Sequence, residues 1–237
     1  MTFRLLIKFI IAPLPSAVLR LMYRALFGYK IGRGVRIGLS IIDSDECVIE
    51  DDVSIGHFNI VIGTKRLFVG DHVRIGHFNV IRGGDEVVLG RYSEIIRFNE
   101  INSIPDPDVV NEIDPRFHLG AGSVIVASHK IDFTDRVTFG KRVILGGRNS
   151  SLWTHNRQMT RPITVGDHAY LGSEIRIAPG GEIPERCVVG IGSVITKKIE
   201  GENTLIAGVP AKVIDSLGEE GQFLAEYKTR KDLPDDV

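Results

Sequence analysis

Apolar residues recur at two nested spacings through most of the chain. One is an offset of 20 residues, which aligns the segments 51–63, 71–83 and 91–101. The other is about six residues, where an aliphatic residue precedes a small or acidic one, as at Val165, Leu171 and Ile177. Six-residue spacing suits a short strand and a tight turn, with the aliphatic side chain pointing inward. Three such steps make a triangular coil, so the pattern predicts stacked coils of parallel strands, a β-helix.

The 20-residue offset also aligns residues that are not aliphatic. In stacked coils like residues lie over like, because neighbouring strands are about 4.8 Å apart. We therefore expect two ladders along one edge, formed by Phe58, Phe78 and Phe98 and by Asn59, Asn79 and Asn99. His57 and His77 also occupy equivalent positions, which favours a stacked surface row over a site.

Two stretches interrupt the repeats. Residues 101–115 carry three prolines and several acidic residues, which is typical of a loop leaving the coil. Residues 150–163 contain His155 and the only tryptophan, Trp153, and do not repeat. An irregular polar loop on a rigid repetitive scaffold is where chemistry is expected.

The two ends of the chain differ from the repeats. Residues 1–28 read as two short helical pieces broken at Pro13 and Pro15, with no acidic residue before Asp43. A basic amphipathic segment over residues 3–27 fits a helix lying on an anionic membrane surface, and it equally fits a cap on the first coil; the two roles are compatible. Helical spacing over residues 216–231 predicts a terminal helix covering the last coil. The predicted units are 1–30, 31–214 and 215–237.

Bulk composition excludes several classes of protein. The chain has 237 residues and a formal net charge of −1, so no general affinity for nucleic acid is expected. No apolar run approaches the roughly 20 residues that a spanning helix needs, and no secretory cleavage site is evident. Two distant cysteines, Cys47 and Cys187, form no disulfide framework or metal motif. They predict a cytoplasmic protein with reduced thiols, at the inner face of the membrane if the N-terminal segment binds there.

Residues 165–214, from VGDHAYLGS to AGVPAKVI, resemble the C-terminal signature of sugar O-acetyltransferases of the hexapeptide-repeat family. The similarity runs from about Ile31 to Ile214. It implies an all-β solenoid, a left-handed parallel β-helix of about eight coils. General rules on crossovers would predict the opposite hand. The resemblance also implies a homotrimer with active sites between subunits, which cyclic symmetry allows.

The same resemblance implies that His155 is the catalytic base. Its loop reads Thr154-His155, then Arg161-Pro162-Ile163, then Val165-Gly166-Asp167, as in the family. The implied reaction moves an acyl group, most simply acetyl, from coenzyme A to a hydroxyl of a sugar or glycan precursor. A hydroxyl is too weak an acid to ionise near neutral pH, and an imidazole with a pKa near 6.5 accepts its proton during attack.

Further site residues are expected for the two substrates, and no metal is required. The resemblance carries coenzyme A contacts over to Ser173, to Gly190, Ile191 and Gly192, to Thr196 and Lys197, and to Lys212. Ile191 replaces an alanine of the family pattern, and its larger side chain narrows the expected coenzyme A slot. His129 lies about one coil before His155, so stacking of the coils would bring its neighbourhood to the same cleft. We therefore expect the acceptor cleft to be lined by Ser128, His129, Asp132 and Asn149. Trp153 either packs the base of the loop or floors the acceptor site.

Other functions on the same scaffold stay open at the sequence level. Transfer to a sugar amine differs only in the acceptor. A γ-class carbonic anhydrase needs three convergent histidines, and His72 and His77 have the five-residue spacing of two of them without a third in place. A non-catalytic β-helix would have no need of the His155 loop.

Overall fold

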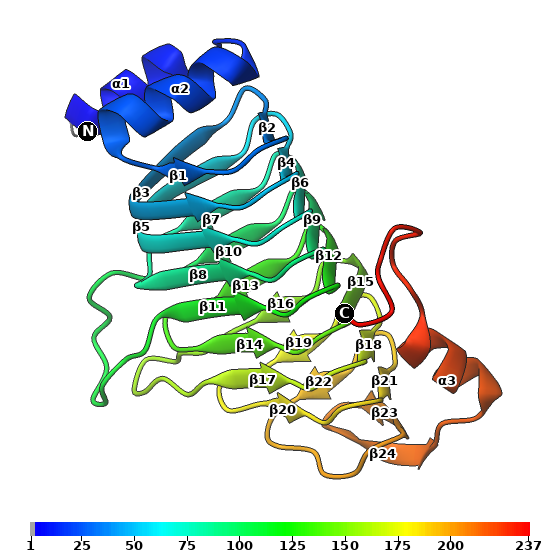
Figure 1. Ribbon diagram of the computed structural model, residues 1–237. Coiled ribbons are helices and arrows are strands. Elements are labelled where there is room, and N and C mark those ends of the chain that lie inside the picture. Colours follow the sequence, from blue (N-terminus) through cyan, green and yellow to red (C-terminus); the bar gives the residue numbers. More distant parts are fainter. Residues whose placement is uncertain (1–2) are drawn as a thin grey trace.

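The computed structural model describes residues 3–237 and folds residues 30–216 into a solenoid of short, mostly parallel strands (Figure 1). The solenoid has three faces, as the six-residue spacing predicts. Its second face stacks nine parallel rungs, one more than the eight or so expected.

The three faces are built as follows. The first face consists of β1 (Lys30–Ile31), β8 (Glu86–Leu89), β11 (Arg116–Leu119), β14 (Val137–Phe139), β17 (Ile163–Val165) and β20 (Glu182–Ile183). The second consists of β2 (Arg36–Ile37), β4 (Ser54–Ile55), β6 (Arg74–His77), β9 (Glu94–Arg97), β12 (Val124–Ala127), β15 (Ile144–Arg148), β18 (Tyr170–Leu171), β21 (Val188–Val189) and β23 (Thr204–Gly208). The third consists of β7 (Val80–Arg82), β10 (Glu100–Asn102), β13 (Lys130–Asp132), β16 (Ser151–Leu152), β19 (Arg176–Ile177) and β22 (Val194–Ile195). The long strands β3 (Ile41–Ile49) and β5 (Ile60–Val69) turn the corner from the third face to the first.

One apolar row per face fills the interior. Ile55, Ile75 and Ile95 pair in register, and each is at least 96% buried. Burying such a side chain stabilises the fold by about 1.5–3 kcal/mol. The repeated aliphatic positions of the sequence are therefore the core.

The asparagine ladder lies inside the edge between the second and third faces. Asn79 N–H donates to Asn59 Oδ1, and Asn99 N–H donates to Asn79 Oδ1, each at 3.0 Å. The row continues with His129, whose N–H donates to Asn99 Oδ1, and with Ser150, whose N–H donates to His129 Nδ1 at 3.1 Å. Each side chain thus satisfies the backbone of the next coil, which explains polar residues in the core.

The phenylalanine ladder lies outside the same edge, which we call the aromatic edge. Phe58, Phe78 and Phe98 stack with ring centroids 5.0 Å apart and are about half exposed. All three have positive φ angles of 56–61°, a conformation that bulky residues rarely adopt. Each stacked pair contributes about 0.5–1.5 kcal/mol, which offsets part of this backbone cost. The later coils place Ser128 and Asn149 at the same turn position, also with positive φ.

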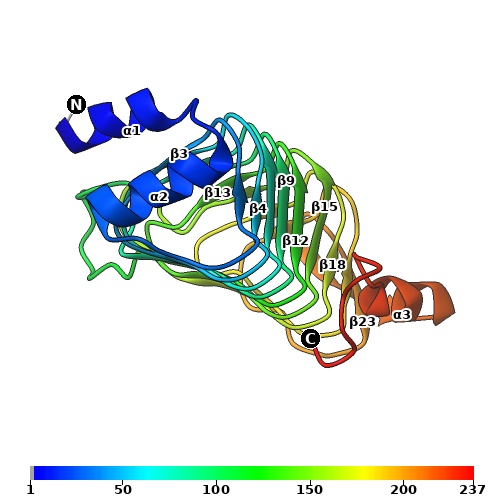
Figure 2. The same cartoon turned by 45° about the horizontal axis from the view of Figure 1, so that its top comes forward.

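The N-terminal segment forms the two predicted helices, α1 (Phe3–Ile11) and α2 (Ser16–Phe27). They lie across the first coil (Figure 2). Ile11, Leu19 and Tyr23 are buried against the core, so the segment acts as a cap. Tyr23 Oη also accepts the N–H of Ile42 at 3.1 Å. Within the described residues, no helix has both the length and the apolar character needed to cross a bilayer.

The C-terminal helix is present but does not cover the last coil as predicted. The chain first adds β24 (Ala211–Ser216), which pairs antiparallel with β23. Helix α3 (Glu219–Glu226) then packs against the outside of the second face, through Leu217 and Ala225 on Val188 (Figure 1). The tail runs back along that face, with ion pairs from Arg74 to Asp232 at 3.1 Å and from Arg91 to Asp236 at 2.7 Å.

Candidate functional site

The edge between the third and first faces carries the two non-repeating loops, and we call it the loop edge. Residues 153–162 leave the coil as a small hairpin, in which His155 bridges to Thr160. Asn156 tightens its turn because Asn156 Oδ1 accepts the N–H groups of Gln158 and Met159 at 2.8 and 2.9 Å. His155 therefore stands on an ordered support at the edge of the solenoid.

A buried carboxylate lies behind His155. Asp132 Oδ2 is 2.8 Å from His155 Nδ1, and the Asp132 side chain is 4% exposed. Asp132 comes from the end of β13, one rung before the strand that leads to His155. An ionised carboxylate only accepts hydrogen bonds, so His155 Nδ1 carries the proton in this pair. Within residues 3–237 His155 Nε2 has no hydrogen-bond partner, and its lone pair is available to a substrate.

Two threonines hold the carboxylate in place. Thr154 donates to Asp132 Oδ2 from its hydroxyl at 2.6 Å and from its backbone N–H at 3.0 Å. The Thr134 hydroxyl donates to Asp132 Oδ1 at 2.6 Å. Both threonines are buried, and each hydroxyl also accepts a backbone N–H, from Asp135 and from Ile104. Fully satisfied polar groups of this kind fix one orientation of the carboxylate and of the imidazole.

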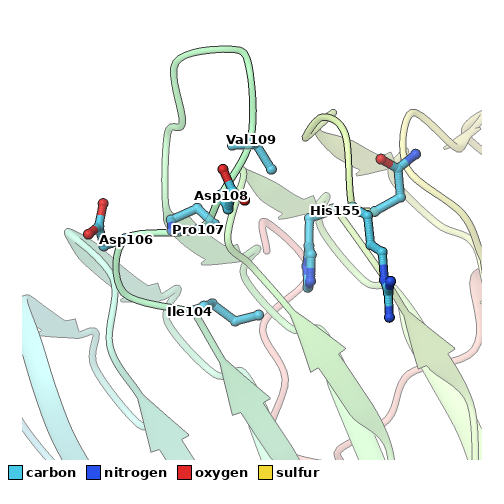
Figure 3. Close-up of a pocket in the computed structure, with 8 residues that line it drawn as sticks. Ile104, Asp106, Pro107, Asp108, Val109 and His155 are labelled. Atoms are coloured by element: carbon cyan, nitrogen blue, oxygen red, sulfur yellow. The ribbon is translucent and has the colours of Figure 1, made fainter.

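The loop between β10 and β11 forms a wall opposite His155. Residues 104 and 106–109 enclose, together with His155, Asn156 and Arg157, a pocket of about 380 Å³ (Figure 3). Asp106, Asp108 and Arg157 are exposed polar side chains in this lining. Carboxylates and guanidinium groups are suited to hydrogen bonding with the hydroxyls of a small polar ligand.

The same loop is fastened to the His155 hairpin by Asn111. Asn111 Oδ1 accepts the N–H of Thr160 at 2.9 Å, and Asn111 Nδ2 donates to Thr160 Oγ1 at 2.9 Å. Val110 N–H adds a bond to the carbonyl of Gln158 at 3.0 Å. Two segments about 50 residues apart in sequence thus form one unit around the pocket.

The structure divides the predicted acceptor residues among three locations. Trp153 lies beside His155, with ring centroids 6.3 Å apart, and Asp132 lies beneath it. Ser128 and Asn149 lie on the aromatic edge, four residues or about 13 Å of strand from the loop edge. His129 is 1% exposed and belongs to the interior ladder, so it does not line the cleft.

The burial of His129 has an electrostatic consequence. Loss of hydration disfavours the charged imidazolium and lowers the pKa of His129 to about 4. The ring is therefore neutral near pH 7. Because its Nδ1 accepts the N–H of Ser150, the proton is on Nε2.

The predicted coenzyme A residues also fall on two edges. Ser173 and Gly190–Gly192 follow β18 and β21 on the aromatic edge, and the backbone N–H of Gly192 donates to the carbonyl of Ser173 at 3.0 Å. Lys212 on β24 is exposed and lies close to this group. It pairs with Ala207 of β23, and Ala207 packs beside Gly190. Thr196 and Lys197 follow β22 on the loop edge, two rungs or about 10 Å beyond the strand that leads to His155. One chain does not bring the first group together with His155.

The two histidines with metal-ligand spacing have other neighbours. His72 stacks on Tyr92 at 4.6 Å, and His77 stacks on His57 at 5.6 Å. Over residues 3–237 no three His, Cys, Asp or Glu side chains gather as a metal site would require.

Comparisons with known proteins find relatives that are named as acetyltransferases. The chain is 28% identical over 127 residues to the galactoside O-acetyltransferase of Escherichia coli, across 51% of this chain and 62% of that protein. It is 30% identical over 105 residues to a putative lipopolysaccharide biosynthesis O-acetyl transferase, WbbJ, of Escherichia coli, across 36% of this chain and 53% of that protein. The chain spans less than two thirds of the length of either relative. No family model matches.

The fold has a clear counterpart among solved structures. The UDP-N-acetylglucosamine acyltransferase from Campylobacter jejuni superposes with a TM-score of 0.59 at 20% identity, over 80% of this chain and 71% of that one. The solenoid thus matches the left-handed β-helix of acyltransferases, as the sequence resemblance implied. By fold and by sequence the chain is similar to the hexapeptide-repeat acyltransferases.

Sequence reasoning missed several residues of the site. Asp106 and Asp108, which line the pocket, and Asn111, which fastens the hairpin, belong to a loop for which the sequence indicates only an exit from the coil, and Thr134 lies in an ordinary turn of the repeat. The signal available was the loop itself, since its prolines and acidic residues leave the coil next to the His155 loop. Only the register of the coils shows that both loops leave the same edge, two rungs apart.

Proposed function

We propose that this protein transfers an acyl group, most simply acetyl, from coenzyme A to a hydroxyl of a sugar or glycan. The observation that carries the proposal is the His155–Asp132 pair, which leaves His155 Nε2 free beside a pocket. The named O-acetyltransferase relatives support the reaction class.

The geometry supports a direct transfer with His155 as general base. The acceptor hydroxyl donates to Nε2, its oxygen attacks the thioester carbonyl carbon, and its proton passes to the imidazole. The C–S bond then breaks, and the imidazolium returns the proton to the thiolate of coenzyme A. The Asp132 carboxylate keeps Nδ1 protonated throughout and stabilises the imidazolium.

A homotrimer is part of the proposal because one chain separates the donor residues from the base. Ser173 and Gly190–Gly192 lie on the aromatic edge, whereas His155 lies on the loop edge. A threefold axis parallel to the solenoid sets one edge of each protomer against a different edge of its neighbour. Lys212, close to the aromatic edge, and Lys197, on the loop edge, are exposed cations suited to the phosphates of coenzyme A.

The pocket beside His155 is the proposed acceptor site. Asp106, Asp108 and Arg157 offer both acceptors and a donor to sugar hydroxyls, and Trp153 offers an apolar ring that is 38% exposed. Rings of this kind pack against the C–H face of a sugar while polar groups set its orientation.

Purified protein incubated with acetyl-coenzyme A and a panel of free and lipid-linked sugars tests the proposal by mass spectrometry. We expect one sugar to gain an acetyl ester, and His155→Ala to lower kcat by about 10²–10⁴-fold. His57→Ala, which changes an exposed histidine of the stacked row, is the matched control and leaves kcat unchanged. Full activity of His155→Ala contradicts the assignment, and an alkali-stable product indicates transfer to an amine.

A further inference from the structure

The N-terminal cap has a second apolar side that packs against nothing in the described chain. Capping the first coil uses Ile11, Leu19 and Tyr23, which are buried. The opposite side of both helices exposes large apolar residues, among them Ile10 and Leu21, which are each 65% exposed. The others are Phe3, Leu6, Phe9, Val18 and Leu26. A cap alone requires one apolar side, so the outer one calls for a separate explanation.

The charged residues of the two helices are all basic. No acidic residue precedes Asp43. Arg20 on α2, and Lys30 and Arg36 on the first rung beneath it, have no carboxylate within ion-pair distance in the part of the chain that is described. Two cations of α1 are paired with carboxylates of β3, Lys8 with Asp43 at 2.5 Å and Arg4 with Asp45 at 3.8 Å. Among the described residues, Arg20, Lys30 and Arg36 remain as unpaired cations on the cap and on the rung beneath it.

We propose that this outer side of α1 and α2 binds an anionic phospholipid surface, with both helices lying in the plane of the interface. Apolar side chains flanked by unpaired cations match the acyl and phosphate layers of such a surface. A second copy of the chain fits less well, since a twofold contact would set the same cations against each other.

A groove links the cap to the candidate site. A cavity of about 840 Å³ begins at Leu5 on α1 and ends at the loop after β10, where Ile104 and Asp106 also line the pocket of His155. Gly63 and Gly83 lie along it and add no side chains. Figures 1 and 2 place that loop on the side of the solenoid where α1 begins. If the proposed function holds, an acceptor carried on a lipid would reach His155 along this groove.

Sedimentation with phospholipid vesicles tests the docking independently of catalysis. We expect the protein to bind vesicles containing about a third phosphatidylglycerol, and to bind phosphatidylcholine vesicles or vesicles in high salt much more weakly. Leu21→Glu or Ile10→Glu should weaken binding at least about tenfold. Phe223→Glu is the matched control, because Phe223 is equally exposed, at 65%, on α3 at the other end. Exchange of Arg20 or Lys30 for Gln should weaken binding about fivefold per charge.

The outcomes separate docking from the proposed function. His155→Ala should bind vesicles like the wild type, because the base is remote from the cap. Absence of vesicle binding by the wild type overturns the docking whether or not acetyl transfer to a soluble sugar is observed. Equal binding of Leu21→Glu, Ile10→Glu and Phe223→Glu, with unchanged thermal unfolding, also overturns it. So does concentration-dependent dimerisation that Leu21→Glu abolishes, since that assigns the face to a second copy.

Discussion

At the scale of single residues, Asp132 is the group whose role changed most between sequence and structure. Stacking predicts that Asp132 lines the acceptor cleft, whereas its carboxylate lies under His155, within hydrogen-bond distance of Thr134 and Thr154. Asp132→Asn preserves the shape but allows the wrong imidazole tautomer. We expect kcat to fall about a hundredfold or more with the KM for acetyl-coenzyme A unchanged.

The kinetic constants separate this positioning role from a structural one. A disturbed substrate site would raise KM together with the loss of kcat, whereas loss of an interaction that stabilises only the transition state lowers kcat at constant KM. Asp45→Asn, an exposed aspartate 76% accessible in its side chain, is the control. Wild-type kcat in Asp132→Asn would contradict the pairing inferred from the geometry.

The buried His129 should make the free energy of unfolding depend on pH. Its pKa is about 4 in the folded chain and near 6.5 when unfolded, so the unfolded state binds more protons between these values. The stabilisation is complete above pH 6.5 and is lost as the pH falls from 6.5 to 4. Between pH 7 and pH 4.5 the free energy of unfolding should fall by about 2–3 kcal/mol from this group.

His129→Asn is the matched variant, because asparagine occupies the three preceding positions of the same ladder. Its Oδ1 can accept the N–H of Ser150, and it does not titrate. Urea unfolding at the two pH values should show a smaller loss in the variant than in the wild type. An equal loss in both proteins would show that His129 does not set the acid sensitivity.

At the scale of elements, the loop from residue 103 to residue 115 and the His155 hairpin act together. Asn111→Ala removes all three side-chain bonds to Thr160. The hairpin should become less ordered, and we expect kcat to fall about tenfold or more with little change in the melting temperature. Val110→Ala, at an 80% exposed position next to Asn111, is the control and should retain full kcat. Equal kcat in Asn111→Ala and the wild type would assign the loop no part in positioning His155.

At the scale of the whole molecule, a shared site predicts complementation between inactive chains. His155→Ala inactivates the loop edge, and Gly192→Trp blocks the aromatic edge at an exposed turn. In trimers refolded from equal amounts of both variants, each site takes its base from one chain and its coenzyme A residues from the next. About one site in four then has both parts intact, so about a quarter of wild-type activity should return. Size-exclusion chromatography with light scattering should give a trimer. Absence of recovery in mixed trimers would place both substrates on one chain.

The sequence alone determined the scaffold, because its information is local and repeated. Ile55, Ile75 and Ile95 at a fixed offset can be buried together only if coils of constant length stack. The same regularity allowed the prediction of the phenylalanine and asparagine ladders, and the loop with His155 was recognisable because it breaks the repeat. Asp132 and Trp153 were also expected near this loop, whereas Thr134 was not recognisable because it occupies an ordinary repeat position.

Tertiary structure decided which of these side chains meet. Asp132 and His129 are three residues apart, yet one ends a strand beneath His155 and the other is enclosed in the core, because the chain turns its side chains in and out along each face. Asn111 meets Thr160 only because two loops leave the same edge of coils that lie two rungs apart. Tertiary structure also decided which side of the N-terminal helices faces solvent. Helical spacing shows that residues 3–27 are amphipathic, and only packing on the first coil shows which apolar side remains exposed.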